Sequence, residues 1–151
     1  MSGLPDLAAV RAYCLAGNAT FTLANPQTGS RRTYKLVRAR PRVGQLPADA
    51  PLICSVLTGP DNGSDYEYLG QVWDSTRLTY CHSSKSTISH ASPAARGIGW
   101  LIRHLDRGTL PLDKMEIHHE GTCGRCGRAL TVPESIERGL GPECARKAGA
   151  A

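Results

Sequence analysis

Hydrophobic positions along the first 81 residues predict a short helix followed by a run of strands. A weakly amphipathic stretch over residues 4–15 begins near Pro5-Asp6 and ends before Gly17, as a short helix does. The segments that follow alternate apolar and polar residues or are continuously apolar, and turn-rich sequence separates them. We expect an antiparallel meander of strands at 18–23, 32–40, 52–57, 66–73 and 77–81.

A longer amphipathic helix is predicted over residues 93–107. Ser92-Pro93 gives it an N-cap and a proline at the first helical position, and Gly108 ends it. Its apolar side chains recur on one face and should cover the sheet. The expected fold class is therefore α+β: a mainly antiparallel β-sheet with one covering helix. The helix residues expected to face the sheet are Ala94, Ile98, Leu101, Ile102 and Leu105.

The C-terminal segment carries the strongest chemical signal, and its pattern predicts a zinc site. Cys123 and Cys126 have the C-x-x-C spacing that lets one tight turn present two thiolates to a tetrahedral ion. Gly141-Pro142 predicts a helix start, with Cys144 in its first turn, where backbone N–H groups favour the thiolate. Between these cysteines, Thr131 and Glu134 match a capping box for a short helix that ends at Gly139. We expect a small module like a zinc knuckle or treble clef.

A structural zinc site usually has four protein ligands, so a histidine is expected to complete this one. If residues 115–120 form a strand, Ile117 and His119 point to one apolar face, which makes His119 the preferred fourth ligand and His118 the reserve. The alternatives are three reduced cysteines in a core, or a disulfide with one spare thiol. A catalytic zinc would need an open position and an acid or base such as Glu120 or Glu143.

The segment CGRCGRALTVPESIERGLGPEC resembles a family of small uncharacterised zinc-finger domains found in phage and mobile-element proteins. Their pattern is CGRCGR-x-LT-x-P-x-SI-x-x-G-x-GP-x-C, and the match covers about residues 119–146. The upstream phrase VLTGPDNGSDYEYLG is similar to a segment that accompanies this finger. The resemblance implies zinc and a mobile-element origin, but no established activity. Its metal positions correspond to His119, Cys123, Cys126 and Cys144.

Length and composition are those of one domain with a small appended module. The chain has 151 residues, of which 40% are hydrophobic, so it is able to form a core. We expect an α+β domain over 1–116 and a zinc-binding module over 117–151. The sequence has no run as long as a membrane span and no signal-peptide pattern. A cytoplasmic protein with reduced thiols is therefore expected, which favours metal over disulfides.

A basic segment is the first candidate binding surface. The chain carries a formal net charge of +5, and residues 31–42 contain no acid. Guanidinium groups beside an aromatic ring suit phosphate contact and base stacking. The alternative is an edge strand that its charges keep from aggregating. The expected nucleic-acid-binding residues are Arg31, Arg32, Tyr34, Lys35, Arg38, Arg40 and Arg42.

A second candidate surface lies on the polar face of the 93–107 helix, at Arg96, Trp100, Arg103 and Arg107. Tryptophan beside arginine marks a protein-binding hot spot or a stacking platform for bases. Alternatively, Trp100 packs against the zinc module. A cluster of acids could bind a cation, pair with the basic strand or face a basic partner; its members are Asp61, Asp65, Glu67 and Asp74.

No nucleophile elbow, phosphate-binding loop or dinucleotide motif is present, so we expect no enzyme and no small-molecule substrate. The zinc module is near neutral, with five Lys/Arg and four Asp/Glu over residues 118–148. The first expected function is a zinc-stabilised phage or mobile-element protein that binds nucleic acid through its basic strand. The alternative is a protein-binding inhibitor or adaptor that acts on a host defence or transcription complex.

Overall fold

The computed structural model describes residues 2–61, 63–130 and 133–147, and it has the expected α+β architecture. The chain divides into two compact units, residues 1–33 with 111–151, and residues 34–110. The N-terminal segment thus groups with the cysteine module, whereas the sequence suggested domains of 1–116 and 117–151. That domain pair stays a prediction. No helix in the described ranges is long and apolar enough to cross a bilayer.

The first unit is built around a strand that the C-terminal half of the chain supplies. This strand, β7, pairs antiparallel with the N-terminal β1 and with β2, and His119 lies opposite both Ser2 and Phe21. Asp6 caps the first helix, α1, because its carboxylate accepts a hydrogen bond from the backbone N–H of Ala9. The elements are β1 (Ser2–Gly3), α1 (Leu7–Cys14), β2 (Asn18–Ala24), β7 (Glu116–His119), α3 (Pro133–Arg138) and α4 (Pro142–Lys147).

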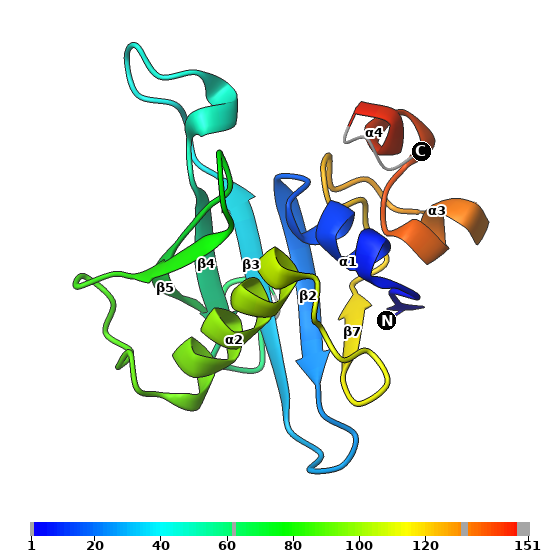
Figure 1. Cartoon of the computed structure of the whole chain (residues 1–151), viewed down its shortest axis with the longest axis horizontal. Helices are drawn as coiled ribbons and strands as arrows, with labels where there is room; N and C mark the ends of the chain where they lie inside the picture. The colour runs from blue at the N-terminus through cyan, green and yellow to red at the C-terminus, as the bar shows by residue number, and fades with distance from the viewer. Residues whose placement is uncertain (1, 62, 131–132, 148–151) are drawn as a thin grey trace. The chain divides into compact units, whose positions relative to one another are not determined.

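The second unit is an antiparallel meander under one helix, as the sequence predicts. Its strands pair in chain order, β3 with β4, β4 with β5 and β5 with β6. In Figure 1, α2 lies across the strands of its own unit. The elements are β3 (Arg31–Arg38), which begins in the first unit, the 3-10 turn η1 (Pro47–Asp49), β4 (Leu52–Leu57), β5 (Tyr66–Trp73), β6 (Thr79–His82) and α2 (Pro93–Arg107).

The predicted limits of α2 are confirmed. The Ser92 side chain accepts a hydrogen bond from the N–H of Ala95, and Gly108 ends the helix with a φ of 68°, a conformation that favours glycine. The buried helix side chains are Ala95, Ile98, Leu101, Ile102 and Leu105, with Ala94 less buried than expected.

A short helix between the cysteines is also confirmed. The expected N-cap, Thr131, lies outside the described residues. The helix α3 ends at Arg138, and Gly139 follows with a φ of 75°. Leu140 then turns back and is fully buried. The predicted helix end therefore agrees with the structure, and Leu140 packs in the core of the module.

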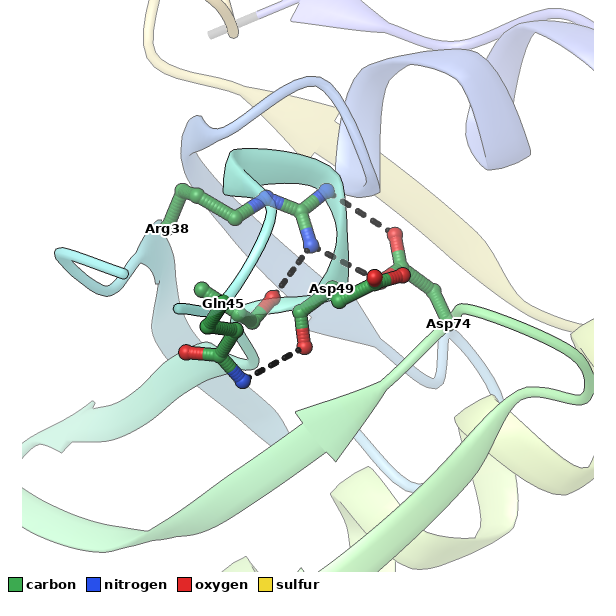
Figure 2. A network of polar contacts seen from close by, with 5 residues as sticks. Arg38, Gln45, Asp49 and Asp74 are labelled. Atoms are coloured by element: carbon green, nitrogen blue, oxygen red, sulfur yellow. Dashed lines mark hydrogen bonds and ion pairs between the residues drawn. The ribbon is translucent and has the colours of Figure 1, made fainter. Parts of the chain in front are cut away.

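The loop after β3 is held by a polar network (Figure 2). The Arg38 guanidinium donates to both carboxylate oxygens of Asp74, at 2.7 and 2.9 Å, and to the carbonyl oxygen of Ala50 at 2.9 Å. Gln45 donates from its amide to the carbonyl oxygen of Asp49. The acidic cluster was expected to bind a cation, to pair with the basic strand or to face a basic partner. Its member Asp74 pairs with the basic strand, through Arg38.

We expect the Arg38–Asp74 pair to contribute measurably to stability. Its side chains are only 26% and 14% exposed, so solvent screens the pair incompletely. A double-mutant cycle with Arg38→Met and Asp74→Asn should give a coupling of about 1–2 kcal/mol by urea unfolding. Arg77–Asp106 is the matched control: Arg77 is 75% exposed, and the coupling should stay below about 1 kcal/mol. Equal couplings for the two pairs would contradict this argument.

Candidate metal centre

Three cysteine thiols meet in the C-terminal part of the first unit. The Sγ atoms of Cys123, Cys126 and Cys144 all lie within 4.8 Å of one another. Three sulfurs about 2.3 Å from one tetrahedral zinc would be separated by about 3.8 Å, so the group needs little adjustment to share an ion. These three predicted ligands are therefore brought together, and they could hold a metal ion.

A tight turn presents the first two thiols. The N–H of Cys123 donates to the carbonyl oxygen of Arg128 at 2.8 Å, and the N–H of Gly127 donates back to the carbonyl of Cys123 at 2.9 Å. Gly127 adopts a φ of 78°, which explains why glycine follows the second cysteine. Gly141 then leads into α4, which carries Cys144 in its first turn as predicted.

Backbone groups stabilise the ionised form of Cys123. The N–H groups of Arg125 and Gly141 each point at its sulfur from 3.4 Å. Burial raises the pKa of this thiol, but hydrogen bonds from the backbone of Cys126, Gly141 and Arg125 lower it more, to about 7. Burial raises the pKa of Cys144. The Arg125 guanidinium donates a hydrogen bond to its sulfur at 3.7 Å, which lowers this pKa but by less than burial raises it. Such N–H···S contacts are the surroundings that metal thiolates have in proteins.

The N-terminal segment packs directly against this turn. A Cβ atom at Gly124, between the two cysteines, would lie 2.3 Å from Cδ2 of Tyr13. The backbone N–H of Asn18 donates to the carbonyl oxygen of Gly124, at 2.6 Å, and Gly124 donates to Gly139 at 2.8 Å. Sequence reasoning missed Tyr13 as a support of the site. The sequence signal for this contact was Gly124, because a glycine between the two cysteines has no side chain and lets another group approach the backbone closely.

His119 is buried as predicted, but it does not join the thiols. Its Nδ1 accepts the N–H of Gly121 at 2.9 Å, and its Nε2 bonds to the carbonyl oxygen of Ile136, so Nε2 carries the proton. Both ring nitrogens thereby bond to backbone groups, and the cluster found among the described residues consists of the three cysteines. The role of His119 as the fourth ligand stays a prediction. His118, the reserve, is half-buried and lies 3.3 Å from a Glu116 carboxylate oxygen.

A cavity of about 500 Å³ opens beside the cysteines. Its lining residues include the cationic Arg125, Arg128 and Lys147 and one acid, Glu143. Ser135, from α3, also lines it and is only 2% exposed, and its buried hydroxyl has no hydrogen-bond partner among the described residues. The described part of the chain thus places three thiols at one cavity.

The basic strand does not present the predicted array. Tyr34 is fully buried, and its hydroxyl donates to the carbonyl oxygen of Ala94 at 2.7 Å, so its ring is covered and cannot stack on a base. This corrects its predicted role: Tyr34 and Leu36 share the face that the helix covers. Arg38 pairs with Asp74, and the Lys35 ammonium lies 4.1 Å from the centre of the Tyr66 ring. Arg31, Arg40 and Arg42 are exposed, and Arg32 is half-buried.

The second predicted surface forms a groove on α2. Arg96, Arg103 and Arg107 are exposed, and Trp100 is half-buried beside His104, with ring centres 4.6 Å apart. The groove has a volume of about 530 Å³. Its lining residues are Pro93, Arg96, Gly97, Gly99, Trp100 and Arg103.

Fold and site together define an α+β protein with a three-cysteine candidate metal centre. Residues 114–149, which contain that centre, match a family of unknown function (DUF6011). No curated protein and no solved structure matches the chain. The match agrees with the resemblance to an uncharacterised domain, while the zinc-finger class and the phage origin stay predictions.

Proposed function

We propose that the metal is zinc and that its role is to hold the first unit together. Three thiolates with N–H···S hydrogen bonds suit zinc, a borderline-soft ion that favours sulfur ligands. Among the described residues, the miniature core around the site comprises four buried residues, Cys123, Leu140, Cys144 and Ala145, and two of them are candidate ligands. A core of this size needs an additional source of stability, which a bound metal supplies.

We further propose that the protein binds single-stranded nucleic acid, and the α2 groove is the observation that carries this. Arg96 and Arg103 line it beside Trp100, and both arginines are exposed. Guanidinium groups that contact phosphates, next to an aromatic ring on which a base stacks, are the usual elements of single-strand binding. Burial of Tyr34 moves the stacking role to Trp100. Arg40 and Arg42 add exposed positive charge in the same unit.

The arginines of the groove should set the salt dependence of binding. With a fluorescent single-stranded oligonucleotide, Arg96→Ala combined with Arg103→Ala should reduce the slope of log affinity against log salt by about 1.4, since each phosphate contact on a single strand contributes about 0.7. Trp100→Leu should weaken binding by about 1–3 kcal/mol without changing that slope. Arg77→Ala, at an exposed arginine outside the groove, is the control and should leave both quantities unchanged.

No binding at about 50 mM salt, or an unaltered slope in the double variant, would contradict nucleic-acid binding.

A protein partner is the second candidate function, and one observation favours it. Val43 and Leu46 project from the loop after β3 with 108% and 67% of their surface exposed. Val43→Ser with Leu46→Ser should abolish capture of a host complex from nuclease-treated lysate, while the groove variants should retain it.

A further inference from the structure

The sheet of the second unit has one face that its helix does not cover. Along β4 the side chains of Leu52, Cys54 and Val56 are at most 3% exposed, and the residues between them are half-buried. The buried set faces α2, because Tyr34, the partner of Val56, donates a hydrogen bond to the carbonyl oxygen of Ala94 on that helix. In the described part of this unit α2 is the single α-helix, so the opposite side of the strands, here called the outer face, has no helix of its unit over it (Figure 1).

Strand pairing identifies the side chains of the outer face. Residues opposite each other on paired strands point to the same side of a sheet. Lys35 lies opposite Ser55, and Ser55 lies opposite Tyr68, so all three belong to the outer face. The Lys35 ammonium lies 4.1 Å from the centre of the Tyr66 ring, which places Tyr66 on this face beside it.

A tryptophan and two aliphatic side chains extend the same face. Val72 is buried opposite Leu52, so the next residue along β5, Trp73, points outward. Val37, which is 39% exposed, lies opposite the half-buried Ile53. Solvated faces of antiparallel sheets commonly carry polar side chains, whereas this one is largely apolar and aromatic. An apolar face of this kind, open to solvent, indicates a binding surface.

The charge of the outer face selects the kind of partner. Among the described outward positions of β3 to β6 in this unit, Lys35 is the one charged side chain, and no acid is present. Two exposed arginines, Arg40 and Arg42, follow the end of β3, which is the end of the sheet where Trp73 lies. A second copy of the chain would cover the apolar side chains but would offer Lys35 no carboxylate from the same face. A single-stranded nucleic acid supplies both planar bases and phosphates.

We infer that the outer face of the meander binds the bases of a single-stranded nucleic acid. One base stacks on Trp73 and another on Tyr68, while Lys35, Arg40 and Arg42 contact phosphates. The two aromatic residues are five positions apart on β5, about 15 Å at the usual rise of a strand, a span that suits the two or three bases that an open sheet binds. The inference rests on the proposed nucleic-acid binding for the class of ligand, but it shares no residue with the α2 groove.

The two tryptophans of the chain allow each site to report its own occupancy. Trp73 lies on the outer face and Trp100 lines the α2 groove. Trp100→Phe leaves Trp73 as the single indole, and unlabelled oligothymidylate should quench its fluorescence saturably, because a stacked base quenches an excited indole. Trp73→Phe leaves Trp100 to report on the groove in the same titration. Phenylalanine keeps an aromatic ring at each position, so neither variant leaves a large cavity.

The outcomes of this titration separate the two sites. Quenching of Trp100 without quenching of Trp73 would overturn the inference and leave the proposed groove standing. Quenching of Trp73 alone would support the outer face and remove the groove. Quenching of neither would contradict both. Polyglutamate, an anion without bases, should leave Trp73 fluorescence unchanged; an equal response to polyglutamate would identify an acidic protein segment as the occupant and overturn the inference.

Variants of the outer face give a second readout, in the protein that keeps Trp73 as its single indole. Tyr68→Leu should weaken oligothymidylate binding about tenfold, whereas Tyr68→Phe, which keeps the ring, should bind like its parent. Lys35→Gln should reduce the slope of log affinity against log salt by about 0.7, the share of one phosphate contact. Lys85→Gln, at an exposed lysine of the connection before α2, is the matched control and should leave the slope unchanged. Equal affinities of Tyr68→Leu and Tyr68→Phe would overturn the inference.

Discussion

Cys126→Ser should release the metal and unfold the first unit in the same step. The exposed Cys126 contributes little to packing, so its replacement by the similar-sized serine removes a ligand and almost nothing else. In modules this small the metal-binding free energy is largely folding free energy, and zinc-finger peptides gain about 10–16 kcal/mol from it. We expect the free energy of unfolding to fall by more than about 3 kcal/mol, with metal content lost by elemental analysis.

Two controls separate metal loss from loss of a thiol. Cys81→Ser changes an exposed cysteine on β6, outside the cluster, and should keep both metal and stability. A chelator should lower the stability of the wild type to that of Cys126→Ser and should leave the variant unchanged. Full metal content in Cys126→Ser would refute the three-thiolate centre.

Tyr34→Ala should destabilise the second unit by about 3–5 kcal/mol, the range for loss of a large buried aromatic side chain. Its ring is fully buried beneath α2, and a Cβ at Gly97 would lie only 2.8 Å from its hydroxyl. Tyr34→Phe keeps the packing and removes the hydrogen bond to Ala94, so it should cost about 0.5–1.5 kcal/mol.

Val37→Ala is the matched control on the same strand. Val37 is 39% exposed, and its truncation should cost under about 1 kcal/mol in the same urea titration. Neither Tyr34 variant should reduce oligonucleotide affinity while the protein stays folded. A near-neutral Tyr34→Ala that impairs binding would restore the surface role that the sequence indicated for this residue.

Features that depend on neighbours in sequence were predictable. The limits of α2 follow from Ser92, Pro93 and Gly108, each of which acts within one helical turn. The spacing of Cys123 and Cys126 and the helix start before Cys144 likewise needed no information on distant residues. The order of the meander was predictable because strands that follow one another in the sequence usually pair, even across the longer connection of residues 39–51.

Which side of a strand is covered was decided by tertiary structure. Alternation places Tyr34 and Leu36 on one face, but it does not say whether that face meets solvent or the helix α2, which begins more than fifty residues later. Because basic residues surround Tyr34 and Leu36 in the sequence, this face of the strand was expected to be exposed to solvent. The pairing of Arg38 with Asp74 depends in the same way on packing between distant strands.

The amino-acid sequence by itself determined the three clustered cysteines, the inward face of His119 and the helix that covers the meander. Only the tertiary structure showed that both nitrogens of His119 bond to backbone and that Tyr13 packs against Gly124. It also grouped residues 1–33 with the cysteine module through the pairing of β7 with β1 and β2. Local patterns fix how a segment is folded and which way its side chains alternate. The partner that each face meets is selected by packing over the whole unit, because burial and hydrogen bonding are satisfied there collectively.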